Sequence, residues 1–552
     1  MKITQIWPSL FIILYNFSLS LFYILSTIRR REKQKLRERE RELEMEEEST
    51  DMQLVLIPWP VMGHVQIIEF AKLIIHRQNH LLPLGRTLSV TVLVIKLPDY
   101  IDTVSSSFAD SLSASSSTTG AAASSGLNFF LLPTTDPIPA EWSSRTRGYF
   151  MHNLVQSQKS NVSDFLRSRR RRIAGVVVDM LCTTMMGVAE DVGLPSYVFF
   201  TSPASFLGAM LHCQTLHDQQ SMDVAELRNA DSDVHIPSFA KPVPPQVLSM
   251  VLVDKQIWLE RFLHHARDYR RAKGIIVNTF TELESHALDS FSLDSAYGDG
   301  GNIPPVYPIG PIMNHHRHSR SSPSSEVIIM EWLEKQPPSS VVLLCFGSQG
   351  SLHEDQVRQL AVGLERSGQR FIWSLRRQSP EGEEAKFPSE YGGHDALRGV
   401  LPDGFLDRTA EKGKVVGWVP QLELLSHRSV GGFVSHCGWN SVLESLWCGV
   451  PIATWPLHAE QEMNAFQLAR ELGLAVVITL SYDERKSVVM AAEIERGIRE
   501  LMEESGRGSE VRKRVEEMSE KSKLSVVEGG SSYISLNRLI HNVMSNVHVP
   551  EQ

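Results

Sequence analysis

The hexapeptide HCGWNS, residues His436–Ser441, gathers several reactive side chains around one glycine. A histidine beside a cysteine could form a nucleophilic thiolate pair. The same two side chains could also contribute to a metal site. Alternatively, Asn440 and Ser441 are neutral hydrogen-bond donors beside Gly438, and such a group can hold an anion close to the backbone. The elements on either side of the hexapeptide help to separate these three possibilities.

The residues around HCGWNS predict a turn between a buried strand and a helix. The apolar run GGFVSH leads into it, and the amphipathic pattern NSVLESLWCG follows and ends at Gly449 and Pro451. Free backbone N–H groups and the positive end of the helix dipole meet at a helix start, which favours phosphate. Helix capping by Asn440 or Ser441 is the structural alternative. A thiol nucleophile is disfavoured because Cys437 has no obvious base in register.

The composition narrows the kinds of partner that this protein is expected to bind. The chain has 552 residues, of which 42% are hydrophobic, so two or three soluble domains are expected. Its net charge of −9 argues against nucleic acid as the main partner. The five cysteines are scattered and include no C-x-x-C pair, which indicates reduced thiols and weakens the metal interpretation. A small molecule is therefore the expected partner.

Apolar runs of strand length alternate with helical patterns from Gln53 onward, and this alternation occurs in two blocks. The first block predicts strands at Leu54–Pro58, Leu88–Leu97, Leu127–Leu132, Ala174–Asp179, Ser196–Phe200 and Gly274–Asn278. The second predicts a strand that runs into a glycine-bearing turn at Val341–Gly350, and strands at Phe371–Leu375, Lys414–Trp418, Gly431–His436 and Pro451–Pro456. Their continuous hydrophobicity is typical of parallel strands that helices cover on both faces.

The two blocks predict an α/β protein with two doubly wound parallel-sheet domains. We assign residues 51–301 to the first domain, 302–330 to a linker rich in Pro and Ser, and 331–552, with its C-terminal helices, to the second. Ser105–Gly126 and Arg376–Gly399 are predicted to be irregular loops. Ligands of such sheets bind beyond the carboxyl ends of the strands. HCGWNS lies at one of these ends.

Residues 1–50 are assigned to a leader outside the domains. Ile3–Ile28 is apolar, free of charge and long enough to span a bilayer, and Arg29–Arg31 follow it. Taken literally, this segment is a signal anchor that keeps the domains in the cytosol. The Arg/Glu alternation of KLREREREL favours a second hypothesis, because a translated repeat of AGA and GAG codons would encode it. Translation would then start at Met45 or Met52, and the leader is excluded from the fold.

Trp418–Gln461 resembles the signature of plant family 1 UDP-glycosyltransferases. It begins WVPQ, contains HCGWNSVLESLWCGVP and ends AEQ. The resemblance extends from about Gln53 to Val547, and ESLWCGVPIATWPLHAEQEMNAF is similar to the subgroup that glucosylates flavonoids and other phenolics. It implies the GT-B architecture, in which two Rossmann-like domains face each other across a cleft. It also implies UDP-glucose as the donor substrate.

The resemblance implies that many residues of the second domain bind the UDP-sugar. Trp418 would stack on the uracil ring, and Glu444 would accept hydrogen bonds from the ribose hydroxyls, as suits an indole and a carboxylate. Ser348 and the HCGWNS residues would meet the diphosphate, and Trp439, Glu460 and Gln461 the sugar. The complete implied set is Ser348, Trp418, Val419, Gln421, His436, Gly438, Trp439, Asn440, Ser441, Glu444, Glu460 and Gln461.

The same resemblance places the catalytic base in the first domain. In PWPVMGH, His64 lies just beyond the first predicted strand, where the family's catalytic histidine lies, and Asp179 matches its aspartate partner. A neutral imidazole can take the proton of an acceptor hydroxyl, and a carboxylate can fix its tautomer. A single histidine in a turn is more often structural, but Asp179 at another strand end favours catalysis. Val61 and Met62 are bulkier than is common in this turn, which affects the predicted shape of the acceptor pocket.

Together these features predict an inverting O-glucosyltransferase that acts on a hydroxyl of a small phenolic or flavonoid-type metabolite. Because no D-x-D pair lies near the donor motif, no metal or other cofactor is expected. The protein is expected to be a cytoplasmic monomer. It would meet a membrane only if residues 1–31 form a real anchor. Two alternatives stay open: a membrane-anchored sterol or lipid glycosyltransferase, and a nucleotide-sugar-binding pseudoenzyme without activity.

Overall fold

The computed structural model describes most of the chain between residues 51 and 546. The segments that it does not describe within this range are 62–63, 65, 82–86, 100, 102–105, 107–108, 110–125, 135–136, 144–145, 257, 294–295, 299–302, 314–322, 380–385 and 483–487. The leader, and with it both hypotheses about residues 1–50, lies outside the described residues, as does most of the predicted loop Ser105–Gly126. Within the described part, no helix is both long and apolar enough to cross a bilayer.

The first domain is built on a seven-stranded parallel sheet with the order β3-β2-β1-β4-β5-β6-β7. All six strands predicted in the first block are present. The strands are β1 Asp51–Ile57, β2 Thr87–Val94, β3 Leu127–Leu131, β4 Ile173–Asp179, β5 Ser196–Phe200, β6 Gly274–Val277 and β7 Val306–Pro308. Every residue of β4 is buried, which explains its unbroken run of apolar residues. The seventh strand, β7, lies inside the predicted linker 302–330.

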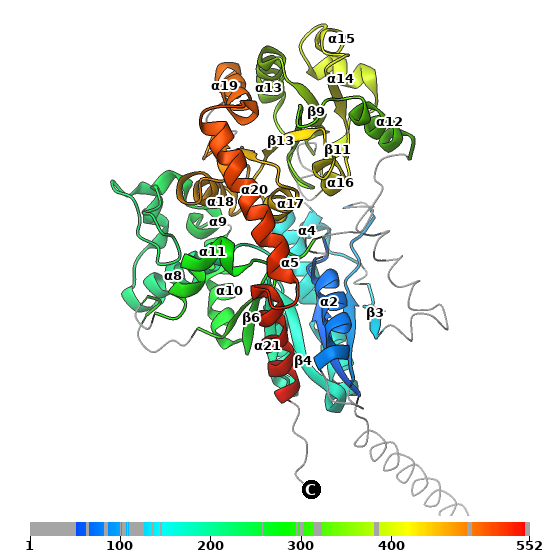
Figure 1. Cartoon of the computed structure of the whole chain (residues 1–552). Coiled ribbons are helices and arrows are strands. Elements are labelled where there is room, and N and C mark those ends of the chain that lie inside the picture. The colour runs from blue at the N-terminus through cyan, green and yellow to red at the C-terminus, as the bar shows by residue number, and fades with distance from the viewer. Residues whose placement is uncertain are drawn as a thin grey trace, which may run out of the picture.

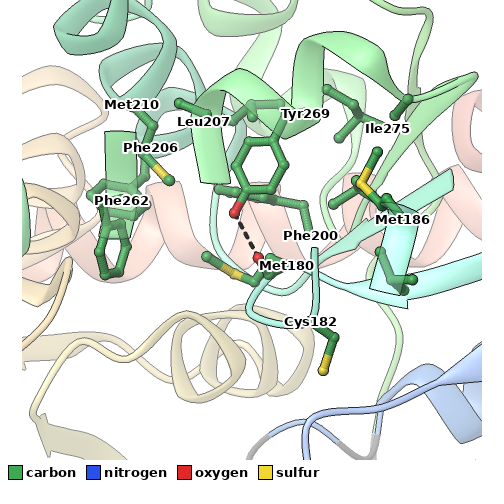
Figure 2. Close-up of a cluster of buried hydrophobic side chains, with 14 of the residues drawn as sticks. Met180, Cys182, Met186, Phe200, Phe206, Leu207, Met210, Phe262, Tyr269 and Ile275 are labelled. Carbon is green, nitrogen blue, oxygen red and sulfur yellow. Dashed lines mark hydrogen bonds between the residues drawn. The ribbon is translucent and has the colours of Figure 1, made fainter. Parts of the chain in front are cut away.

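Helices cover both faces of this sheet. On one face, α7, α8 and α10 bury a cluster of aromatic and sulfur-containing side chains around Phe200 and Met180 (Figure 2). On the other face, α2 packs against residues such as Leu54 and Val177. The helices of this domain are α2 Gln66–Leu81, α4 Ala140–Ser143, α5 Arg147–Ser157, α6 Lys159–Arg169, α7 Thr184–Val192, α8 Ala204–Gln220, α9 Met250–Val253, α10 Leu259–Arg271 and α11 Thr281–Ser290, with short 3-10 turns at Arg170–Arg172, Val224–Asn229 and Pro245–Val247.

The second domain has a six-stranded parallel sheet with the order β12-β9-β8-β13-β14-β15. Its strands are β8 Val341–Cys345, β9 Arg370–Ser374, β12 Gly413–Val416, β13 Val430–Ser435, β14 Ile452–Thr454 and β15 Ala475–Val477. The predicted irregular loop Arg376–Gly399 instead contains the antiparallel pair β10 Arg376–Arg377 and β11 Ser389–Glu390, followed by helix α14 (His394–Val400). The prediction of two doubly wound parallel-sheet domains is therefore confirmed.

Most helices of the second half pack around this sheet. Two of them depart from the predicted domain boundaries. The helices of this half are α12 Pro323–Glu334, α13 Glu354–Ser367, α14 His394–Val400, α15 Phe405–Arg408, α16 Gln421–Leu425, α17 Trp439–Cys448, α18 Gln461–Phe466, a π-helical turn Gln467–Glu471, α19 Ala491–Met502, α20 Arg507–Val526 and α21 Ser531–Ser545. The first departure is α12, which begins inside the predicted linker. The second is the last helix of the chain.

Helix α21 returns to the first domain, although its sequence position placed it in the second. Figure 1 shows α20 descending from the second domain and α21 lying along the first sheet. Leu536, Leu539 and Ile540 form an apolar stripe that is buried in the same cluster as α2. Tyr197 in β5 also donates a hydrogen bond to Asn542 Oδ1 at 2.6 Å. The stripe is buried there because it packs against the apolar face of the sheet beside α2.

Candidate active site

His64 and Asp179 meet at the carboxyl end of the first sheet. The strands β1 and β4 are parallel neighbours, with Ile57 paired to Val178, so the segment after β1 lies beside the end of β4. His64 Nδ1 is 2.7 Å from Asp179 Oδ2, although the residues are 115 positions apart. The Asp179 side chain is fully buried, whereas that of His64 is 17% exposed. The fold thus brings together the two residues that the sequence proposed as a pair.

The second oxygen of Asp179 fixes the direction of this contact. Its Oδ1 accepts a hydrogen bond from the backbone N–H of Leu181 at 2.9 Å, which leaves Oδ2 for the imidazole. A carboxylate only accepts hydrogen bonds, so the proton of neutral His64 sits on Nδ1. The other ring nitrogen, Nε2, is then an acceptor. An imidazole held in this way can remove a proton from a hydroxyl that lies in the cavity.

The HCGWNS turn joins β13 to the start of α17, as predicted. Gly438 is the residue before the first helical turn, and Cys437 has a left-handed backbone with φ of 60°. A Cβ on Gly438 would lie 2.4 Å from His436 Nε2, and one on Gly347 would lie 2.5 Å from the same atom. The two glycines therefore allow two turns to close around one imidazole. Burial, with His458 and Arg376 nearby, lowers the pKa of His436 to about 3, so its ring is neutral at pH 7.

The thiol of Cys437 is not arranged for nucleophilic catalysis. Burial raises its pKa to about 12, and its sulfur lies 3.5 Å from the carbonyl oxygen of Ser435. A buried neutral thiol is a poor nucleophile. All five cysteines of the chain are unpaired, as the sequence indicated. Among the described residues, no group of three or more His, Cys, Asp or Glu side chains is placed to hold a metal ion.

Three of the predicted UDP-sugar-binding residues form one hydrogen-bonded group. Gln421 Nε2 donates to Ser441 Oγ at 2.9 Å and to Glu444 Oε2 at 2.7 Å. Burial raises the pKa of Glu444 to about 7. Trp418 and the buried Val419 are followed by Pro420 and then by α16, which begins at Gln421. The beginnings of α16 and α17 thus face each other across this group.

Two further predicted residues, Trp439 and Glu460, contact the first domain, and Gln461 follows Glu460 in the chain. Trp439 is buried, and its indole N–H donates to the backbone oxygen of Asn278 at 2.7 Å. Gln461 Oε1 accepts from the backbone N–H groups of Leu457 and His458 at 2.9 and 3.0 Å. Burial raises the pKa of Glu460. A hydrogen bond from Ser202 opposes this shift, as does the proximity of His64. The carboxylate of Glu460 therefore lies on the His64 side of the site.

A single cavity of about 1020 Å³ connects these groups. It is lined by His64 and by every one of the predicted UDP-sugar-binding residues: Ser348, Trp418, Val419, Gln421, His436, Gly438, Trp439, Asn440, Ser441, Glu444, Glu460 and Gln461. Asp179 is not part of the lining because it is buried behind His64. Val61 lines the cavity, whereas its neighbour Met62 lies outside the described residues. The structure thus places the predicted residues of both domains around one space.

The remaining wall near His64 is mostly apolar. It includes Trp59, Val61, Met151, Phe206, Trp258 and Phe262, which come from several elements of the first domain. A wall of this kind suits a flat hydrophobic molecule. The cavity therefore has a polar half, formed by the starts of α16 and α17, and an apolar half beside His64.

Several polar residues that line the cavity were not predicted from the sequence. Arg376 is only 5% exposed, and its guanidinium donates to the backbone oxygens of Gly347 and Gly350 in the turn after β8. Thr201 Oγ1 lies 3.4 Å from His64 Nδ1, and Ser202 contacts Glu460. All three follow the carboxyl end of a strand, β9 or β5. That position is the signal that could have identified them.

Comparison with known proteins gives a consistent result. Residues 321–493 match the family model described as UDP-glucoronosyl and UDP-glucosyl transferase. A Fragaria ananassa protein named putative UDP-glucose flavonoid 3-O-glucosyltransferase 3 is 48% identical over 501 residues, which cover 89% of this chain and 99% of that protein. UDP-glycosyltransferase 71A15 of Malus domestica is 46% identical over 504 residues, with 89% and 99% covered.

Solved structures agree with the fold described above. A Siraitia grosvenorii transferase in complex with UDP is 44% identical, with a TM-score of 0.75 over 89% of this chain and 100% of that chain. UGT71G1 of Medicago truncatula, complexed with UDP-glucose, is 34% identical, with a TM-score of 0.76 over 90% and 99%. The two facing Rossmann-like domains are thus the predicted GT-B architecture. The chain belongs to the plant UDP-glycosyltransferase family and is a glycosyltransferase.

Proposed function

We propose that this enzyme transfers glucose from UDP-glucose to a hydroxyl of a small phenolic or flavonoid-type acceptor. The observation that carries the proposal is the single cavity that joins the His64–Asp179 pair to the start of α17. The relatives support the choice of substrates, since two named flavonoid 3-O-glucosyltransferases from Fragaria ananassa are 48% and 44% identical to this chain. The Medicago truncatula protein was solved with UDP-glucose.

The polar half of the cavity is the proposed donor site. The free N–H groups and dipole of α17, together with the Asn440 and Ser441 side chains, would bind the diphosphate. Arg376, 5% exposed, adds positive charge at the turn that contains Ser348. Glu444 would accept hydrogen bonds from the ribose hydroxyls, beside Gln421. Trp418 offers a flat surface to the uracil ring.

The apolar half is the proposed acceptor site, and His64 is its general base. His64 Nε2 takes the proton of the acceptor hydroxyl as the oxygen forms a bond to the anomeric carbon of glucose. The bond from that carbon to the β-phosphate oxygen breaks on the opposite face, so the configuration inverts and UDP leaves. Asp179 stabilises the imidazolium that forms. The start of α17 and Arg376 stabilise the negative charge that develops on UDP.

We also propose that the reaction needs no metal or other cofactor, because α17 and Arg376 already supply positive charge at the proposed diphosphate site. The five unpaired cysteines are suited to a reducing compartment, which supports the cytoplasm as the location. A monomer is expected because one chain provides both halves of the cavity.

The proposal is tested by incubating the purified protein with UDP-glucose or UDP-galactose and a panel of phenolics and flavonoids. We expect glucosides from UDP-glucose, a lower rate with UDP-galactose, and no detectable product from a His64→Ala variant. Full turnover by that variant would show that His64 is not the base, whereas binding of UDP-glucose without product from any acceptor would support the pseudoenzyme alternative. The measurement is product formation by chromatography and mass spectrometry.

A further inference from the structure

One face of helix α10 forms part of the acceptor wall and carries an arginine. Trp258, Arg261, Phe262 and His265 all line the cavity, and their spacing of three, four and seven positions places them on one side of the helix. Three of these residues have aromatic side chains. The guanidinium of Arg261 is the unexpected member of this otherwise aromatic surface.

Helix α10 is fixed to the loop that follows Asp179. Tyr269 donates a hydrogen bond to the backbone oxygen of Met180 at 2.9 Å, as Figure 2 shows. His265 Nδ1 lies 2.8 Å from Thr183 Oγ1 in the same loop. Phe262 packs against Phe206 with ring centroids 6.4 Å apart. Arg261 is therefore held by the same framework that positions the His64–Asp179 pair.

Arg261 has no carboxylate partner among the described residues. Its guanidinium carbon lies 5.7 Å from the ring centre of Tyr149 and 5.9 Å from that of Trp258. Its Nη1 atom is buried and makes no hydrogen bond within the described part of the chain. Burial lowers its pKa, but a guanidinium stays charged at neutral pH. A half-buried cation without an anion costs stability, so a ligand that supplies the anion would bind favourably here.

Two other arginines of α10 have carboxylate partners, whereas Arg270 donates to Gln214, to Thr215 and to two backbone oxygens. Arg267 pairs with Asp218 at 2.6 Å, and Arg271 pairs with Asp268 at 3.0 Å. Neither Arg267 nor Arg271 lines the cavity. The helix therefore pairs these two arginines outside the cavity and leaves the cavity-facing Arg261 without such a partner.

The neighbours of Arg261 do not neutralise its charge. Burial, with a contribution from Arg261 itself, lowers the pKa of His152 to about 4 and that of His265 to about 3. Both imidazoles are therefore neutral at pH 7, and His152 can offer a further hydrogen bond within the cavity. This end of the acceptor site thus places the positive charge of Arg261 beside aromatic walls.

We propose that Arg261 binds a carboxylate carried by the acceptor, so that phenolic acids are preferred acceptors. The planar guanidinium matches a carboxylate, and the rings of Trp258 and Phe262 can hold the aromatic body of the same molecule. The carboxylate is bound and is not changed. The phenolic hydroxyl gives its proton to His64 and receives the glucose. The inference rests on the proposed function and narrows its acceptor class.

Two acceptors that differ only in this charge test the proposal: 4-hydroxycinnamic acid and its methyl ester. At saturating UDP-glucose, we expect the full-length protein to have a KM about tenfold lower for the acid, the size of effect typical of one charge-assisted contact. Arg261→Gln should raise the KM for the acid by about tenfold and that for the ester by less than about twofold. Arg261→Lys should restore part of the difference. Arg267→Gln, on the same helix, is the control and should change neither KM.

Several results would overturn the proposal. These are equal effects of Arg261→Gln on both acceptors, a wild-type preference for the ester, or transfer of glucose to the carboxylate instead of the phenol. If Arg261→Gln does not fold, Arg261→Met carries the same comparison, because it also removes the charge and keeps a long side chain. Calorimetric binding of both compounds in the presence of UDP separates this inference from the proposed function. Binding that depends on Arg261 without any turnover would refute only the function, whereas turnover of both compounds without a charge preference would refute only the Arg261 site.

Discussion

Replacement of Asp179 by asparagine tests the proposed base most directly. Asp179 Oδ1 accepts from the Leu181 N–H at 2.9 Å, and Oδ2 faces His64 Nδ1 at 2.7 Å. In Asp179→Asn, the amide oxygen must remain toward Leu181, because an NH₂ group there would oppose another donor. The amide nitrogen then faces His64 Nδ1. The imidazole must accept at Nδ1 and carry its proton on Nε2, which faces the acceptor.

The expected loss follows from these two changes. His64 in the wrong tautomer cannot accept the hydroxyl proton, and its imidazolium form would lack a carboxylate. General-base catalysis contributes about 10²–10⁴ in rate, and the same substitution in a serine protease triad costs about 10⁴. We therefore expect kcat to fall about a thousandfold, which corresponds to about 4 kcal/mol of activation free energy. The shape of the site is retained, so the KM for UDP-glucose should change less than about twofold.

The assay is the initial rate of glucoside formation across a pH series, together with the thermal unfolding midpoint of each variant. Asp268→Asn is a matched control, because Asp268 is a buried carboxylate that pairs with Arg271 outside the cavity lining. It should keep kcat within about threefold. If Asp179→Asn is folded and retains more than about a tenth of the wild-type kcat, the assignment of His64 and Asp179 is wrong.

Three further predictions concern the proposed donor site. Glu444→Gln should raise the KM for UDP-glucose about tenfold, because a charged acceptor for the ribose hydroxyls is lost. Burial raises the pKa of Glu444 in the folded state to about 7 from 4.5. Between these pH values the native state binds more protons than the unfolded state, so the free energy of unfolding falls as the pH rises. In Glu444→Gln, the thermal unfolding midpoint measured without ligand should therefore depend less on pH between 5 and 8. The same dependence as in the wild type would contradict this explanation. Gly438→Ala should weaken UDP binding about tenfold or more in calorimetry, since the new methyl would meet His436 Nε2 at 2.4 Å, and unaltered affinity would show that the turn is adaptable. Finally, the rate in EDTA should equal the rate without it, and a loss restored by Mg²⁺ would disprove metal independence.

Much of the fold could be predicted because the relevant signals are local. Continuous apolar runs identified the buried strands of both sheets, and β5 has the predicted bounds Ser196–Phe200. The predictions were wrong where a segment is weakly patterned. Strand β7 has only three residues and gains its place by pairing with β6. The apolar stripe of α21 is visible in the sequence, but nothing local says which sheet it covers.

The sequence by itself determined the strand-and-helix order, the HCGWNS turn at a helix start and the types of the residues expected to do chemistry. Tertiary structure alone decided which of them meet. It brought His64 to 2.7 Å from Asp179 across 115 positions and joined both domains around one cavity. It also left Arg261 inside that cavity while the neighbouring Arg267 was paired with Asp218. Local patterns fix dihedral angles and faces, whereas ion pairing and burial depend on packing between distant segments, which no local pattern records.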